Sequence, residues 1–244
     1  MELKICHLYP DVLNQSGDAG NIKCFVKRLE WRGIDVSVTK FLIGEKRSLK
    51  GFDLVFIGGG QELGQQALIE DLHAGRAEDI RAAVEEGVVF LTIGAGFELL
   101  GKYHETKDGQ RTALAAAVDM YTVDASERFT GDYMFDCAAS AGGSRVVAFE
   151  NHSGRTYLGE GVEPLGTVLS GKGNNGEDGC EGLHYKNVFG SYGHGPLLAK
   201  NPELCDFILK TALERKYGSA QLKALDDSME TQAHSGMIRR LGGR

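Results

Sequence analysis

The sequence predicts an α/β protein built on a mostly parallel sheet flanked by helices. Two observations support this prediction. Apolar, strand-like runs alternate with helical patterns through the first half of the chain, which is typical of βαβ units and a parallel sheet. One of these runs, Val88–Ile93, leads into the small residues Gly94-Ala95-Gly96 and then at once into a helical pattern. A strand, a tight turn and a helix in this order have the form of a nucleophile elbow.

The elements of the first half follow in regular order. A strand is predicted at Leu3–Tyr9 and a helix at Asn21–Arg32, because apolar residues recur there at helical spacing and Gly33 follows as a C-cap. The remaining elements are strands at Val36–Val38, Leu54–Ile57 and Val88–Ile93, and a helix at Ala77–Glu86 that Gly87 closes.

The second half of the chain is richer in short strands and ends in one more packed helix. The predicted strands are Tyr157–Leu158, Leu165–Leu169, Leu183–Tyr185 and Val188–Tyr192, and the helix is Phe207–Tyr217. No internal repeat or domain boundary is visible. We therefore expect one domain over residues 1–217 and a polar, loosely held C-terminal tail over residues 218–244.

Composition excludes several classes of protein. A net charge of -7 over 244 residues argues against non-specific nucleic-acid binding. The longest apolar runs are too short to span a bilayer, and the first residues enter a strand directly, so we expect no transmembrane segment and no signal peptide. The five cysteines share no CxxC spacing. We expect reduced thiols in a cytoplasmic protein, without disulfides, a metal site or a cofactor.

Two glycine-rich segments are candidates for chemistry. Gly58-Gly59-Gly60 follows the strand Leu54–Ile57, so its N–H groups are predicted to form either an oxyanion hole or an ordinary tight turn. His194, between two glycines after the strand Val188–Tyr192, lies where α/β enzymes place a general base, although a lone histidine is often structural. A nucleophile elbow has Ser or Cys at its apex, whereas this chain has Gly94.

Three further motifs contain weaker candidates. His152, in a polar turn with Gly154, is either a ligand contact or a hydrogen-bonded corner. Arg128 is either a clamp for a carboxylate or a surface charge. Asp18 and Asn21 are interpreted as a helix N-cap.

Taken together, these motifs resemble the class I glutamine amidotransferase domains of the cobyric-acid-synthase type, and among them the GatD-type glutaminase subunits of lipid II isoglutaminyl synthase. The resemblance covers about residues 1–217. Its segments are Ser16–Ile22, Phe56–Gln61, Arg128–Asp132, Phe149–Thr156, Gly173–Asn175 and His184–Pro196.

The resemblance implies a function and a set of site residues. Such a subunit hydrolyses glutamine and passes ammonia to a MurT-like Mur ligase, which amidates the D-glutamate of lipid II. In the family, a cysteine at the elbow is the nucleophile and the histidine matching His194 is its base. Backbone N–H groups matching Gly59, Gly60 and Ala95 would hold the oxyanion, and Arg128 and His152 would contact glutamine. A third triad member would come from the partner.

This chain departs from the family elbow, which reads roughly Ile-Cys-Gly-Gly-Tyr/Phe-Gln-Leu-Leu-Gly. Gly94 replaces the cysteine, Ala95 replaces a glycine and Glu98 replaces the glutamine. Cys137 is not at an elbow and is a poor substitute. Two hypotheses follow: a subunit that supplies ammonia to the ligase, or a catalytically inactive scaffold that binds the ligase, which then uses free ammonia.

Overall fold

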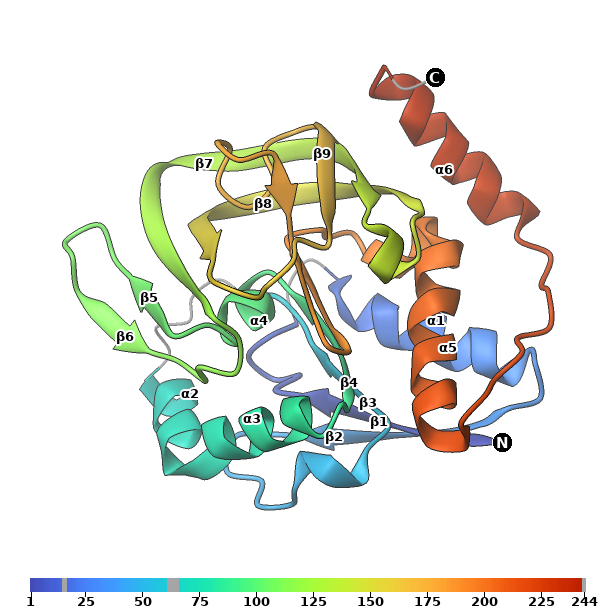
Figure 1. The fold of residues 1–244 in the computed structure, drawn as a ribbon, viewed down its shortest axis with the longest axis horizontal. Coiled ribbons are helices and arrows are strands. Elements are labelled where there is room, and N and C mark those ends of the chain that lie inside the picture. The colour runs from blue at the N-terminus through green and yellow to red at the C-terminus, as the bar shows by residue number, and fades with distance from the viewer. Residues whose placement is uncertain (15–16, 61–65, 243–244) are drawn as a thin grey trace.

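A computed structural model describes residues 1–14, 17–60 and 66–242 of the chain (Figure 1). Its central sheet has the strand order β11-β12-β4-β3-β1-β2. All neighbouring pairs are parallel except β11 with β12. The strands are β1 (Glu2–Leu8), β2 (Asp35–Phe41), β3 (Leu54–Ile57), β4 (Val89–Ile93), β11 (Leu183–Tyr185) and β12 (Val188–Ser191).

Helices cover both faces of this sheet. Helices α1 (Ala19–Glu30) and α5 (Pro202–Tyr217) lie on one face, and α2 (Gln66–Asp71) and α3 (Ala77–Glu85) lie on the other (Figure 1). In β3, successive side chains point to opposite faces of the sheet. Leu54 and Phe56 pack with α1 and α5, while Val55 and Ile57 pack with α2 and α3. A strand that is buried on both faces therefore consists of consecutive apolar residues, and such a run can be recognised in the sequence.

A second, mostly antiparallel sheet lies against the first (Figure 1). Its order is β10-β9-β7-β5-β6, with β8 paired to β7. Its strands are β5 (Tyr103–Glu105), β6 (Arg111–Ala113), β7 (Met120–Cys137), β8 (Arg145–Leu158), β9 (Gly166–Ser170) and β10 (Cys180–Glu181).

The remaining helical elements are short, apart from one near the C-terminus. Helix α4 follows β4 directly, and the π-turn η3 contains Gly75 at a φ of 123°. These elements are η2 (Leu49–Gly51), η3 (Leu72–Arg76), α4 (Ala95–Glu98), η4 (Ala139–Ala141), η5 (Leu197–Lys200) and α6 (Ser228–Arg240).

The predicted fold class is confirmed, and the predicted elements of the first half are found with small shifts of their ends. The second half differs more. Tyr157–Leu158 is only the end of the long strand β8, and its long partner β7 is not predicted at all. Ser16, Gln61, Gly243 and Arg244, which belong to predicted motifs or to the tail, lie outside the described residues.

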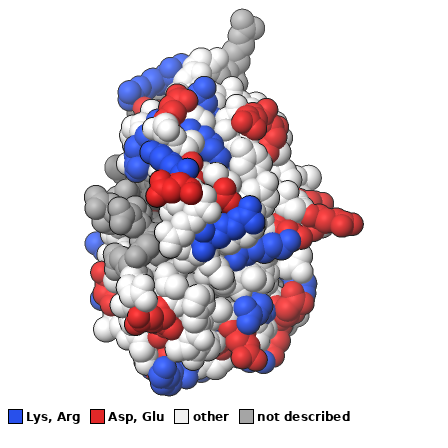
Figure 2. All heavy atoms as spheres, turned by 90° about the vertical axis from the view of Figure 1, so that its left-hand side faces the viewer, with Lys and Arg blue, Asp and Glu red and all other residues white. Residues whose placement is uncertain are grey.

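The molecular surface is consistent with the overall charge balance. Lys and Arg side chains lie beside Asp and Glu side chains over the face shown in Figure 2, and neither sign covers that face alone. Among the described residues, no helix combines the length and the hydropathy needed to cross a bilayer.

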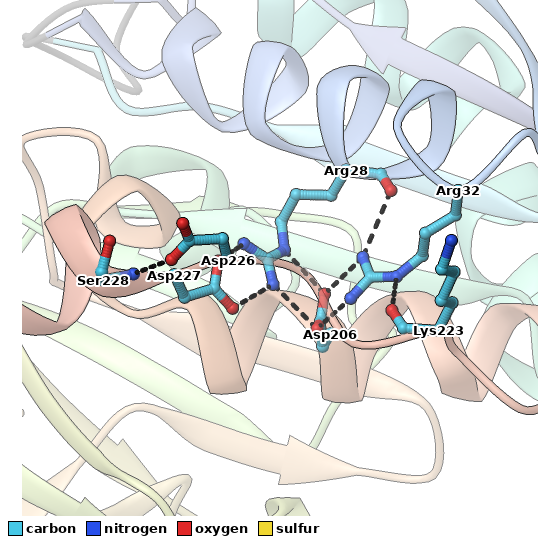
Figure 3. Close-up of polar contacts among 7 residues, drawn as sticks. All are labelled: Arg28, Arg32, Asp206, Lys223, Asp226, Asp227 and Ser228. Carbon is cyan, nitrogen blue, oxygen red and sulfur yellow. Dashed lines mark hydrogen bonds and ion pairs between the residues drawn. The ribbon is translucent and has the colours of Figure 1, made fainter.

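The segment after Gly218 contains helix α6. No residue of α6 is buried, so ionic contacts rather than a core hold its start. Arg28 of α1 donates to Asp206 of α5 and to Asp227, the residue before α6, at 2.5–2.8 Å (Figure 3). Arg32 also pairs with Asp206 and donates to the Lys223 carbonyl at 2.7 Å.

Removal of the Arg28 guanidinium is expected to destabilise the protein. The Arg28 side chain is only 5% exposed, so an Arg28→Met variant leaves the carboxylates of Asp206 and Asp227 without their shared partner. We expect a loss of about 3 kcal/mol in the free energy of unfolding, measured by urea denaturation. The control is Lys27→Met on the same helix, because the exposed Lys27–Glu30 pair contributes less than ~0.5 kcal/mol. Equal losses in the two variants would contradict this account of the anchor.

Candidate functional site

A cleft of about 420 Å³ opens beyond the carboxyl ends of β3, β4 and β12, where the second sheet meets the first. Ligands of parallel α/β sheets bind at this edge. Six of the predicted site residues line the cleft: Gly60, Gly94, Ala95, Arg128, His152 and His194. Gly59 lies against the ring of His194, since a Cβ on Gly59 would be 2.7 Å from the His194 Cε1 atom. The structure thus brings all seven positions together.

The turn between β4 and α4 has the sharp geometry that the elbow pattern predicts. Gly94 lies at its apex with φ 52° and ψ −118°, a conformation that strains residues with a side chain. A Cβ on Gly96 would come within 2.6 Å of the Gly58 carbonyl oxygen, so the turn packs directly on the glycine triplet. A Cβ on Gly94 would lie 3.1 Å from Nε2 of His194. A reactive side chain at position 94 would therefore lie beside this imidazole.

His194 is 7% exposed and is held in place at its backbone. Its N–H donates to the Phe149 carbonyl of β8 at 2.9 Å, and its own carbonyl accepts from the Phe149 N–H at 3.3 Å. The two ring nitrogens face different groups. Nε2 faces Gly94, whereas Nδ1 lies 3.4 Å from both carboxylate oxygens of Asp18. A base with a carboxylate behind it is the arrangement of catalytic dyads and triads.

The prediction that Asp18 is the N-cap of a helix is wrong in its role for the side chain. It precedes α1 with helical φ and ψ and makes no side-chain capping bond, because a capping side chain requires extended backbone at this position. Its fully buried carboxylate instead accepts from the Gly59 N–H at 2.7 Å and faces His194. That N–H is therefore engaged by Asp18, contrary to the expectation that it faces an oxyanion. The structure also places an acid behind His194 within this chain.

The first turn of α1 is fitted to the loop that carries His194. A Cβ on Gly20 would lie 2.1 Å from the Pro196 Cγ atom, so only glycine allows the helix to approach this closely. Asn21 Oδ1 accepts from the Leu198 N–H at 2.9 Å, which is also not a capping bond. The Gly17–Asn21 motif thus fixes the position of the histidine loop.

A β-bulge presents Arg128 at the exposed side of the cleft. The pairing of β7 with β8 shifts register between Asp124 and Phe129. Arg128 then donates through Nε to the Asn151 side-chain oxygen at 2.6 Å and through Nη2 to the Asn151 carbonyl at 3.0 Å. This orients a guanidinium, the side chain best suited to bind a carboxylate, at the cleft. The pair of His104 and Asp124, 3.2 Å apart, lies in the same cleft.

Glu98 and His152 both contact Tyr192. The Tyr192 hydroxyl donates to Glu98 Oε1 at 2.8 Å, and its ring stacks on the His152 imidazole with 3.6 Å between centroids. Burial raises the pKa of Glu98 above its ordinary value. A Cβ on Gly154 would lie 2.5 Å from Glu98 Oε1, so the glycine allows this close contact.

Several residues of the cleft were missed as site residues in the sequence. The orienting acid Asp18, the aromatic Tyr192 and the arginine partner Asn151 are named there only as parts of motifs, while His104 and Asp124 lie in unpredicted strands. Cys137, by contrast, is buried at the end of β7 and does not line the cleft. Burial raises the pKa of its thiol to about 12, which makes it inert as a nucleophile.

A buried carboxyl group beneath the histidine loop makes stability depend on pH. Glu181 accepts from Ser191, Tyr133 and the Tyr192 N–H, and burial raises its pKa from 4.5 to about 7. Because the folded pKa is raised, its contribution is complete below pH 4.5 and is lost as pH rises through about 7.

A Glu181→Gln variant should therefore lose less stability than the parent chain between pH 5 and pH 8. We expect the two losses in the free energy of unfolding to differ by about 3 kcal/mol. Urea denaturation at several pH values across this range measures them. The control is Glu160→Gln, which alters an exposed carboxylate and should leave the pH dependence unchanged. Parallel stability curves for the parent and Glu181→Gln would contradict a carboxyl group held neutral by burial.

Comparison with known proteins gives the cleft a family context. Residues 4–202 match the CobB/CobQ-like glutamine amidotransferase domain. The chain is 39% identical to the lipid II isoglutaminyl synthase (glutamine-hydrolyzing) subunit GatD of Staphylococcus aureus, covering 98% of this chain and 96% of that protein. It is 38% identical to the GatD subunit of Streptococcus pneumoniae, covering 95% and 88%.

Solved structures share the fold at low identity. PurLQS from Thermotoga maritima superposes with a TM-score of 0.58 at 18% identity, covering 88% of this chain and 99% of that chain. The glutaminase domain of Trypanosoma brucei CTPS with bound acivicin also has a TM-score of 0.58, at 9% identity, covering 91% and 96%. On the strength of the domain match and the two full-length relatives, the chain belongs to the CobB/CobQ-like glutamine amidotransferase family, within the group of the GatD subunits.

Proposed function

We propose that this protein is the glutaminase-type subunit of a lipid II isoglutaminyl synthase, in which it pairs with a MurT-like Mur ligase that amidates the D-glutamate of lipid II. One observation carries the assignment of the site: position 94 lies 3.1 Å, measured from an added Cβ, from a histidine nitrogen whose ring is backed by a buried carboxylate. The full-length similarity to two GatD subunits supports the pathway. The five free thiols support a cytoplasmic location.

The residues of the cleft take distinct roles in this proposal. His194 is the general base, and Asp18 holds its Nδ1 nitrogen so that Nε2 faces the reacting atoms. Arg128 binds the carboxylate of glutamine, and N–H groups of Gly60 and Ala95 face the oxygen of its side-chain amide. The His152 imidazole stacks on the ring of Tyr192, whose hydroxyl donates to Glu98.

Gly94 favours a second candidate function for the isolated chain. Covalent hydrolysis of an amide by this family geometry requires a nucleophile at the elbow, and glycine offers none. The second candidate is therefore a scaffold that binds and shapes the ligase, which then takes free ammonia. Both candidates share the same partner and differ only in the source of the nitrogen.

Co-expression with a MurT-like ligase tests the partnership. We expect the two chains to elute together at equal stoichiometry in size-exclusion chromatography. We also expect the ligase to amidate lipid II faster with ammonium chloride when this chain is bound than when it is absent. Separate elution of the two folded chains, with no effect on the ligase, would refute both candidates.

A further inference from the structure

The imidazole of His152 is held firmly in the cleft. It is 6% exposed and lines the cavity beside His194 and Arg128. One face of the ring stacks on Tyr192, with 3.6 Å between centroids and 5° between planes. The ring also makes a perpendicular contact with Phe129 at 5.5 Å. The stack therefore holds the plane of the ring in place.

Hydrogen bonding determines which ring nitrogen of His152 carries the proton. Nδ1 lies 2.8 Å from the Gly154 carbonyl oxygen, and a carbonyl only accepts, so Nδ1 carries the hydrogen. Burial lowers the pKa of the ring to about 3, so the imidazole is neutral at physiological pH. Nε2 is then left with a lone pair and can only accept a hydrogen bond.

This acceptor has no partner in the part of the chain that the structure describes. Nε2 of His152 is buried and forms no hydrogen bond there. Buried polar atoms in proteins are nearly always paired, so an unpaired one beside a cleft takes its partner from water or from a bound ligand. The other side chains around the cleft complement this choice. Arg128 donates, whereas Glu98 and Asp124 offer carboxylate oxygens. A ligand with one carboxylate and at least one N–H group would satisfy this set.

We propose that Nε2 of His152 accepts a hydrogen bond from an N–H group of the amino acid bound in the cleft, and that this bond determines ligand selection. The inference rests on the proposed function, in which the ligand is glutamine. Glutamine carries two kinds of N–H donor, the side-chain amide and the α-ammonium group. A carboxylate in place of the donor that bonds to Nε2 would face the lone pair of this nitrogen and be rejected.

The parent chain, with Gly94 in place of a thiol, allows this to be tested by binding at equilibrium. Isothermal titration would compare L-glutamine, L-glutamate and glutaric acid monoamide on the parent chain and on His152→Phe. Phenylalanine keeps a flat ring against Tyr192 but has no acceptor. We expect His152→Phe to bind glutamine about tenfold more weakly, or weaker still. The control is His184→Phe, because His184 stacks on Phe189 outside the cleft and should leave affinity unchanged.

The other two ligands identify the donor. If the amide is the donor, His152→Phe should lower the affinity for both glutamine and glutaric acid monoamide. The affinity for glutamate, already lower in the parent chain, should stay the same. If the α-ammonium group is the donor, His152→Phe should lower the affinity for both glutamine and glutamate. The affinity for the monoamide should stay the same. Equal affinity of folded His152→Phe and the parent chain for glutamine would overturn the inference while leaving the proposed function intact. No binding of glutamine to the parent chain would overturn the inference and the glutaminase candidate together, and would leave the scaffold candidate.

Nitrogen-15 NMR of the parent chain gives a second readout without a variant. The His152 Nε2 signal should be that of an unprotonated ring nitrogen and should move when glutamine is added, while the signals of His184 stay in place. A protonated Nε2 in the free chain, or a signal that does not move at saturating glutamine, would contradict the proposal even if His152→Phe fails to fold.

Discussion

A Gly94→Cys, Glu98→Gln double variant, bound to its ligase partner, is expected to release glutamate from glutamine at least about 10³-fold faster than the unmodified chain. Loss of a nucleophile in a catalytic triad costs about 10⁴–10⁶ in turnover, and part of this should be recovered. The new thiol would lie beside Nε2 of His194, which takes its proton. The thiolate attacks the amide carbon, ammonia leaves with that proton, and water hydrolyses the thioester to glutamate. Coupled detection of glutamate measures the rate.

The matched control is a Gly94→Ala, Glu98→Gln variant. It adds the same Cβ at a φ of 52° and the same close contact with His194, but no thiol. Both variants should therefore lose about 1–3 kcal/mol of stability, and only the cysteine variant should gain turnover. If the cysteine variant folds, binds its partner and still releases no glutamate, the site lacks more than its nucleophile. The scaffold would then be the function of this chain.

The second large effect concerns Asp18. Asp18→Asn, in the background of the cysteine variant, is expected to lower turnover by about 10²–10⁴. An asparagine keeps an acceptor for the Gly59 N–H but turns its NH₂ group toward Nδ1 of His194. The imidazole then places its proton on Nε2, where the base needs a lone pair. Steady-state kinetics should show the loss in kcat, with little change in KM.

A second buried aspartate provides the control for Asp18. Asp71 is also buried and accepts from the Tyr9 hydroxyl and the Gly44 N–H, and it does not line the cleft. Asp71→Asn should lower stability without lowering kcat. If Asp18→Asn leaves the turnover of the cysteine variant unchanged, His194 takes its orientation from another group, such as the acid from the ligase partner that the resemblance implies.

The sequence predicts those parts of the fold where burial leaves a clear pattern. β3 and β4 are buried on both faces, so their apolar runs identify them almost to the residue. The candidate site follows from these strands and from β12, since Gly60 comes after β3, Gly94 after β4 and His194 after β12. A turn that carries site residues can thus be predicted when the strand before it can be predicted.

The features that sequence reasoning missed depend on contacts between distant segments. β7 is long and partly exposed, and its bulge at Asp124 and Phe129 interrupts any alternation. Helix α6 buries no residue, and its anchor at Asp227 depends on Arg28, which is 199 residues away in the chain. Asp18 has the local sequence of a cap, and only its position beside His194, 176 residues later, reveals a different role.

The nitrogen source of the ligase reaction tests the central claim most directly: the family cleft is intact in this chain but lacks its nucleophile. The complex of the unmodified chain with its ligase would be given ATP, lipid II and either amide-¹⁵N glutamine or ¹⁵N ammonium, and the amidated product analysed by mass spectrometry. We predict label in the product from ammonium and none from glutamine, with transfer from glutamine appearing in the Gly94→Cys, Glu98→Gln variant. Efficient transfer of label from glutamine by the unmodified complex would contradict the claim.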